Sequence, residues 1–119
     1  QEAPMIVIAG SIDLDPALRD QALATAGAYI DAALEEPGCR NYEWTADPRV
    51  AERIWVYELW DDEASLRFHF ENAPYRDMGA HLGRHGITGS QISKFRVDLE
   101  EPVYDDTGTP RADFFTASD

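Results

Sequence analysis

The chain has 119 residues and a formal net charge of −13, from 23 acidic and ten basic residues. This length suffices for one domain with one core and excludes two independent ones. The acidic surplus repels phosphate backbones and anionic lipids, which argues against nucleic acid and membrane surfaces as partners. The longest uncharged apolar run, residues 5–12, is far shorter than the roughly 20 residues of a membrane span. Because Cys39 is the single cysteine, we expect a reducing, cytoplasmic environment.

The first third of the chain predicts a strand followed by a helix. Residues 5–12 are rich in Ile and Val, and Asp15 follows as a candidate N-cap with proline at the first helical position. Apolar residues then recur at helical spacing to about residue 36, where Pro37 and Gly38 end the pattern. We therefore predict one strand and one continuous helix in this region.

A strand hairpin is predicted next, from residues 40–45 and 53–60, with Asp47 and Pro48 supplying the turn. Alternate residues of the second strand share a face, because side chains alternate along a strand. One face carries Ile54, Val56, Glu58 and Trp60, and the other carries Trp55, Tyr57 and Leu59. Both faces are largely apolar, so we expect both to be covered.

The second half predicts two helices, one strand and a tail. Asp61 and Asp62 favour a helix N-terminus, and the helix runs to about residue 73. A further helix over residues 75–85 stops at Gly86, and an alternating strand spans residues 91–99. The acidic tail at 100–119 has few apolar residues, which predicts that it is either loose or laid over a partner.

This order of elements predicts an α+β fold of the ferredoxin-like, split βαβ type, with an antiparallel sheet over residues 1–99. Helices cover only one face of such a sheet. The apolar residues on the second face of the third strand therefore require another cover, and we expect a second copy of the chain to supply it.

Three stretches resemble a known family, the antibiotic biosynthesis monooxygenase (ABM) domain of the dimeric α+β barrel superfamily. The stretch EEPGCRNYEW at residues 35–44 is similar to the family pattern E-x-G-C-x-x-Y. Residues 57–75, YELWDDEASLRFHFENAPY, resemble E-x-W-x-D-x-x-A-x-x-x-H followed by a proline and an aromatic residue. The third stretch is MIVIAG at residues 5–10, and the whole resemblance spans residues 5–99.

The resemblance implies a homodimer with a pocket between sheet and helices. In several members it implies oxygenation of phenols, quinols or anthrone-like polyketides without metal or flavin. We therefore expect a small aromatic substrate, molecular oxygen as co-substrate and no cofactor. Other members degrade haem or isomerise a phosphorylated sugar. Haem degradation is disfavoured, because Ser11, His69 and Gly79 stand where that branch has asparagine, tryptophan and histidine.

His69 is the candidate catalytic base, since it corresponds to the histidine of the family's second-helix motif. A phenol reacts with oxygen only after it becomes an electron-rich phenolate, and an imidazole suits that proton transfer. The alternative is a structural histidine bonded to backbone or to a carboxylate across the dimer.

Aromatic and polar residues on the strands are candidate substrate contacts. The aromatic ones offer flat walls for stacking, although filling the core is the alternative role for each. The two polar ones offer hydrogen bonds to substrate oxygens. The six candidates are Ser11, Asn41, Tyr42, Trp55, Tyr57 and Trp60.

Glu58 is an acid on an apolar strand face and needs a partner. We expect an ion pair with Arg40, Arg53 or Arg96, or else an acid of raised pKa. His81 and His85 stand four residues apart, a spacing that allows a shared metal, but with no third ligand in view we predict no metal site.

Two other functions remain open from the sequence. One is a cofactor-free isomerase or lyase that uses the same base without oxygen. The other is a non-catalytic dimer that binds an aromatic compound.

Overall fold

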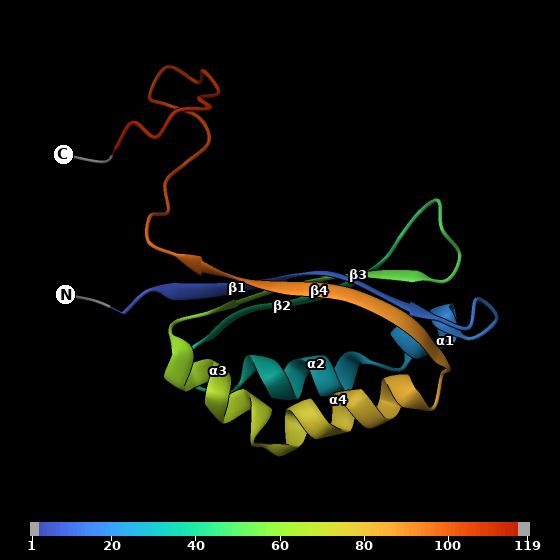
Figure 1. Cartoon of the computed structure of the whole chain (residues 1–119). Helices are drawn as coiled ribbons and strands as arrows, with labels where there is room; N and C mark the ends of the chain where they lie inside the picture. The colour runs from blue at the N-terminus through green and yellow to red at the C-terminus, as the bar shows by residue number, and fades with distance from the viewer. Residues whose placement is uncertain (1–2, 117–119) are drawn as a thin grey trace.

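The fold is described from a computed structural model, which places residues 3–116 (Figure 1). Four strands and four helices follow one another in those residues. In chain order they are β1 (Met5–Leu14), α1 (Arg19–Ala24), α2 (Gly27–Leu34), β2 (Cys39–Ala46), β3 (Arg53–Trp60), α3 (Glu63–Phe70), α4 (Ala73–Gly83) and β4 (Ile87–Val97).

The four strands form one antiparallel sheet in the order β2-β3-β1-β4. The helices lie together on one side of this sheet, and no helix lies on the other side (Figure 1). We call these the helix face and the open face. This arrangement confirms the predicted ferredoxin-like α+β fold. Among residues 3–116, no helix is long and apolar enough to span a bilayer.

The core lies between the helix face and the helices. Ile54, Val56 and Trp60 of β3 are at most 3% exposed and pack with isoleucines of β1. On the open face of β3, Trp55 is 44% and Tyr57 is 40% exposed. The predicted alternation of β3 is therefore confirmed, and one of its apolar faces lies uncovered in a single chain.

The continuous helix predicted up to residue 36 is wrong, because α1 and α2 are separate helices. The Asp15 side chain accepts from Ala17 N, as predicted for a cap, but residues 16–18 form a turn and α1 begins at Arg19. At the other end of α1, the Thr25 hydroxyl donates to the carbonyl of Gln21 at 2.8 Å. The same carbonyl still accepts from Thr25 N at 3.1 Å, but the next N–H, that of Ala26, turns to the carbonyl of Leu23 at 3.2 Å. The regular ladder therefore ends at Thr25, where a side-chain bond to the backbone favours a break before α2.

Two strands are longer than predicted. β1 continues two residues beyond residue 12, and β4 begins at Ile87 instead of residue 91. The two strands pair along their whole lengths, from Met5 opposite Val97 to Leu14 opposite Ile87. Pairing with a neighbour thus extends both strands past their apolar sequence patterns.

Residues 100–116, which we call the C-terminal arm, leave the end of β4 and project on the open-face side (Figure 1). The radius of gyration is 16.5 Å, against roughly 13.5 Å for a compact chain of this length. The arm, which projects away from the sheet, makes the molecule less compact (Figure 1). The predicted boundary near residue 99 stays a prediction, although the arm begins at that point.

Gly10 of β1 lies against the backbone of β4. Its φ is +155°, and a Cβ there would meet the carbonyl oxygen of Gln91 at 2.1 Å. We expect Gly10→Ala to lower the free energy of unfolding by about 2–4 kcal/mol, because backbone must move. Gly89→Ala, in β4 where a Cβ meets nothing within 4 Å, should change it by less than about 1 kcal/mol. Urea denaturation of both variants measures this; equal stability losses would contradict the packing argument.

Candidate active site

Five polar or aromatic side chains form a buried cluster on the helix face, at the end of the sheet made by β2 and β3. We call it the buried polar cluster. Each member is at most 9% exposed. Its members are Glu36, Tyr42, Glu58, Trp60 and His69.

His69 lies in the last turn of α3 and is 1% exposed. Its Nδ1 lies 2.5 Å from Oε1 of Glu36, which follows α2 in the turn before β2. With Glu36 ionised, Nδ1 carries the proton and donates it. The ring also stacks on Trp60 at 4.5 Å between centroids and meets Tyr42 edge-on at 5.5 Å. Its carboxylate partner is thus in the same chain.

Glu58 pairs with an indole and not with an arginine. Trp60 Nε1 donates to Glu58 Oε1 at 2.9 Å, while Arg53 binds Asp13. In residues 3–116 no ion pair reaches Glu58, so the predicted arginine pair is wrong. Burial raises the pKa of Glu58 to about 7, because an indole compensates the lost hydration of a carboxylate only in part.

The same low-polarity surroundings raise the pKa values of two neighbouring groups of β2, a thiol and a phenol. Burial, followed by the negative charge of Glu58, raises the pKa of the Cys39 thiol to about 11. The same two causes raise the pKa of the Tyr42 phenol above its ordinary range. Both groups therefore stay protonated at neutral pH, and neither acts as a nucleophile there.

Two polar atoms in this region have no hydrogen-bond partner within residues 3–116. They are the second carboxylate oxygen of Glu36 and the indole nitrogen of Trp44. Buried polar atoms are paired in most proteins, so an unpaired one calls for an explanation. The open acceptor belongs to the residue that bonds His69, and the open donor belongs to Trp44, whose ring lies 5.7 Å from that of Tyr42. A bound hydroxyl compound or water would use such atoms.

A groove of about 800 Å³ lies between α3 and the paired strands β1 and β4, and no residue of the buried polar cluster lines it. We call it the α3–β4 groove. Ile6, Leu66, Phe70 and Phe95 give it apolar walls, and Arg67, Lys94 and Arg96 add positive charge, with Asp62 and Glu63 also on the lining. The Phe70 ring, 45% exposed, lies 5.9 Å from the His69 ring. The imidazole is therefore one side chain away from the groove.

The sheet divides the residues predicted from the sequence into two groups. Tyr42, Trp60 and His69 come together on the helix face. The others lie on the open face, where Trp55 stands opposite Ser11 and donates its indole N–H to Asp47 at 2.6 Å. Because the sheet separates the groups, they do not line one cavity within a single chain. The open-face group is Ser11, Asn41, Trp55 and Tyr57.

His81 and His85 serve the fold. The His81 ring lies 2.8 Å from the Ala22 carbonyl, which ties α4 to α1, and His85 bonds the carbonyl of His81. Over residues 3–116 no group of three potential metal ligands occurs.

Sequence reasoning missed several residues of the site. Glu36 stands within the quoted motif at residues 35–44, but only the folded chain brings it to His69, 33 residues away. Arg67, Lys94 and Arg96 meet because β4 lies beside β1 and next to α3. One signal in the sequence could have indicated the groove. Leu66 and Phe70 are four residues apart, a spacing that places both side chains on one face of α3, and both line the groove.

Fold and site together define a small ferredoxin-like α+β protein with a buried imidazole–carboxylate pair beside a groove. Residues 5–80 match the model of the family described as antibiotic biosynthesis monooxygenase. The chain belongs to the ABM family, which confirms the resemblance and supports a monooxygenase-like function.

Two curated relatives were compared. The chain is 31% identical over 70 residues to "Uncharacterized protein sll1783" of Synechocystis, a match that covers 59% of this chain and 47% of that protein. The chain thus spans about half the length of that relative. It is 26% identical over 97 residues to "Putative monooxygenase YcnE" of Bacillus subtilis, covering 82% of this chain and all of that protein.

Solved structures share the fold. A conserved protein from Methanosarcina mazei has a TM-score of 0.71 at 20% identity, covering 80% of this chain and 94% of the other. A "putative antibiotic biosynthesis monooxygenase" from Caulobacter crescentus has a TM-score of 0.67 at 22% identity, with 83% and 92% covered. At these identities the likeness shows the fold alone.

The raised pKa of Glu58 predicts a pH-dependent stability. The folded pKa of about 7 lies above the ordinary 4.5, so the folded state holds more protons between those values, and stability falls as pH rises through that window. We expect this loss to reach about 3 kcal/mol. Glu58→Gln removes it, so the variant should gain about that much relative to the parent between pH 4.5 and 8.

Urea denaturation across this pH range measures the difference. Glu43→Gln is the matched control, because Glu43 is an exposed residue of β2 on the other face of the sheet. A Glu58→Gln difference that stays flat with pH would show that Glu58 titrates normally.

Proposed function

We propose that the protein is a cofactor-independent monooxygenase that acts on a phenol-, quinol- or polyketide-like aromatic substrate. The family membership supports the class of reaction, and the family resemblance supports the absence of metal and flavin. The substrate binds in the α3–β4 groove, between sheet and helices.

The observation that carries this proposal is the His69–Glu36 pair beside the groove. Glu36 holds Nδ1–H of the imidazole at 2.5 Å, which leaves Nε2 as the basic atom. Rotation of the half-exposed Phe70 ring is the movement that opens the imidazole to the groove. His69 is then the base, and Glu36 is a positioning residue.

In the proposed reaction His69 removes the proton of a phenolic hydroxyl. The anion passes one electron to oxygen, and the resulting pair combines through a new carbon–oxygen bond. The protonated imidazole returns its proton to the peroxide anion, and the hydroperoxide loses water, together with the hydrogen on the same carbon, to leave a carbonyl. One oxygen atom enters the product, the other leaves as water, and the substrate supplies the two electrons. The protein contributes proton transfer and a shielded site.

Tyr42 and Trp60 are the proposed aromatic contacts behind the groove, because both rings touch His69. Ser11, Asn41, Trp55 and Tyr57 remain predicted contacts, and on the open face they meet a ligand only where a second copy packs. The proposal therefore includes a homodimer formed through the open faces. A cytoplasmic location stays a prediction.

Glu58 favours a second candidate, the isomerase or lyase. A carboxyl group with a pKa of about 7 takes and returns protons at neutral pH without any need for oxygen. Activity in the absence of oxygen would select this function, and binding without turnover would select a ligand-binding dimer.

An oxygen-electrode assay tests the proposal directly. The purified protein, treated with chelator, is offered a panel of quinols and anthrones, with boiled protein as the control. We expect oxygen uptake of one O₂ per carbonyl formed for at least one compound, unchanged by chelation. Product formation without oxygen uptake would overturn the monooxygenase assignment in favour of the second candidate.

His69→Asn tests the base. An asparagine amide can still donate to Glu36 but cannot accept the substrate proton, so we expect kcat to fall about 10²–10⁴-fold with a much smaller change in KM. His85→Asn, outside the cluster, is the matched control and should keep the parent rate. Full activity of a folded His69→Asn protein would remove the base assignment.

A further inference from the structure

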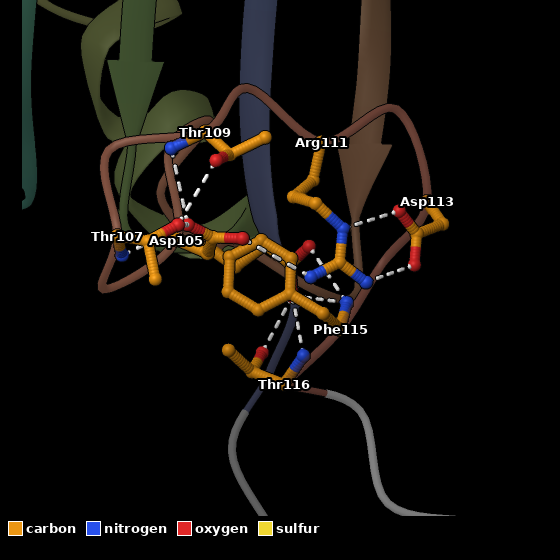
Figure 2. A network of polar contacts seen from close by, with 8 residues as sticks. Asp105, Thr107, Thr109, Arg111, Asp113, Phe115 and Thr116 are labelled. Carbon is orange, nitrogen blue, oxygen red and sulfur yellow. Dashed lines mark hydrogen bonds and ion pairs between the residues drawn. The ribbon is translucent and has the colours of Figure 1, made fainter.

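The C-terminal arm is ordered by its own polar contacts. Asp105 Oδ1 accepts from the backbone and hydroxyl of Thr107 and from Thr109 N, at 2.7–3.1 Å. Arg111 binds both oxygens of Asp113 and also reaches Asp105 (Figure 2). Glu101 accepts from the backbone of residues 115 and 116. The hydrogen bonds described for residues 100–116 all join arm residues to one another.

This network turns apolar side chains outward. Val103 and Tyr104 are 60% exposed, and Phe114 is 66% exposed. Apolar side chains that stay in water do not stabilise a short segment that has no core of its own. The arm also carries five carboxylates against Arg111, a net charge of −4. Its surface is therefore both acidic and aromatic.

The α3–β4 groove has a small surplus of positive charge, because its lining carries three basic residues and two acidic ones, Asp62 and Glu63. Arg67, Lys94 and Arg96 are exposed and form no ion pair within residues 3–116. They represent three of only ten basic residues in a chain of charge −13. Apolar walls from Leu66, Phe70 and other residues lie beside them. An acidic segment with an exposed aromatic ring fits both features.

The arm cannot fill the groove of its own chain as the structure places it, because the arm projects from the open face and the groove lies on the helix face (Figure 1). A second copy packed on the open face would stand beside the arm, which projects on that side (Figure 1). Its groove lies at β4, the edge strand of its sheet, and is therefore reachable from the side.

The fold shared with the solved structures does not account for the whole of this chain. The chain covers 92% of the Caulobacter crescentus structure, but that structure covers only 83% of this chain. The shared fold thus accounts for nearly all of the other protein and leaves a fraction of this one over, about the size of the arm.

We infer that the C-terminal arm of one copy docks over the α3–β4 groove of a second copy, with the net negative charge of the arm facing the three cations and Phe114 against the apolar rim, so that the substrate space lies beneath it. Each site is then completed by its partner. The inference rests on the homodimer of the proposed function, but not on its chemistry.

Cross-linking between two kinds of chain tests the inference. In a Cys39→Ala background, one tagged chain carries Ala64→Cys in the groove and a differently tagged chain carries Phe114→Cys in the arm. Both positions are exposed, so folding should survive. After the chains are mixed and exchanged, a short bismaleimide should join the two tags. Ala80→Cys, on the exposed surface of α4, replaces Ala64→Cys as the matched control and should give at least fivefold less product.

Charge is tested in the same assay. Arg67→Glu with Arg96→Glu should lower the yield at least fivefold, and added salt should lower the parent yield, because exposed charges are screened. Sedimentation of each sample separates the possible failures. A dimer that gives no joined product overturns the docking and leaves the homodimer intact. A single chain that carries both Ala64→Cys and Phe114→Cys gives a further comparison. If this chain is joined only within itself and the two tags are not joined, docking between copies is overturned. A monomer overturns both the docking and the homodimer.

Discussion

The alternation of side chains along β3 is the constraint on which the rest of the structure depends. Hydrogen bonding to β1 on one side and β2 on the other fixes the strand, so it cannot rotate to bury both apolar faces. Its even-numbered residues pack against the helices, and Trp55 and Tyr57 lie in solvent. The single layer of helices therefore completes a core on one face of the sheet. It leaves the apolar residues of the open face available to another protein layer.

The helix face is destabilised in a different way, because ionisable groups are buried there. Glu36 and His69 compensate each other across 2.5 Å, while Glu58 has only an indole donor. An unpaired buried carboxylate is unstable, and the pKa of Glu58 rises until the group is protonated at near-neutral pH. A sequence selected for stability alone would place a leucine there. Glu36, Glu58 and His69 nevertheless lie together close to a groove. Such a group of buried titratable side chains is typical of a site of proton transfer.

Local patterns predicted most of the fold and little of the site. The period-two pattern of β3 and the turn at Pro37 and Gly38 report local geometry, and the structure agrees with them. The break between α1 and α2 was missed because Thr25 acts through a single side-chain bond that no periodicity reveals. The partner of Glu58 was missed because charge suggests arginine first, whereas the neighbour two residues along the same strand face was an indole.

The arm shows where sequence composition misleads. Its acidic, proline-containing sequence is typical of a disordered tail, yet Arg111 alone contacts Asp105, Asp113 and the Phe115 ring at 5.0 Å. Charge that prevents a hydrophobic core can still order a short segment when opposite charges are interleaved. Such order has a consequence for binding, because a preformed arm loses less conformational entropy on docking than a flexible one. Order without a core is therefore the property that suits a segment to binding another surface, and it makes the arm a preformed half of an interface with the groove.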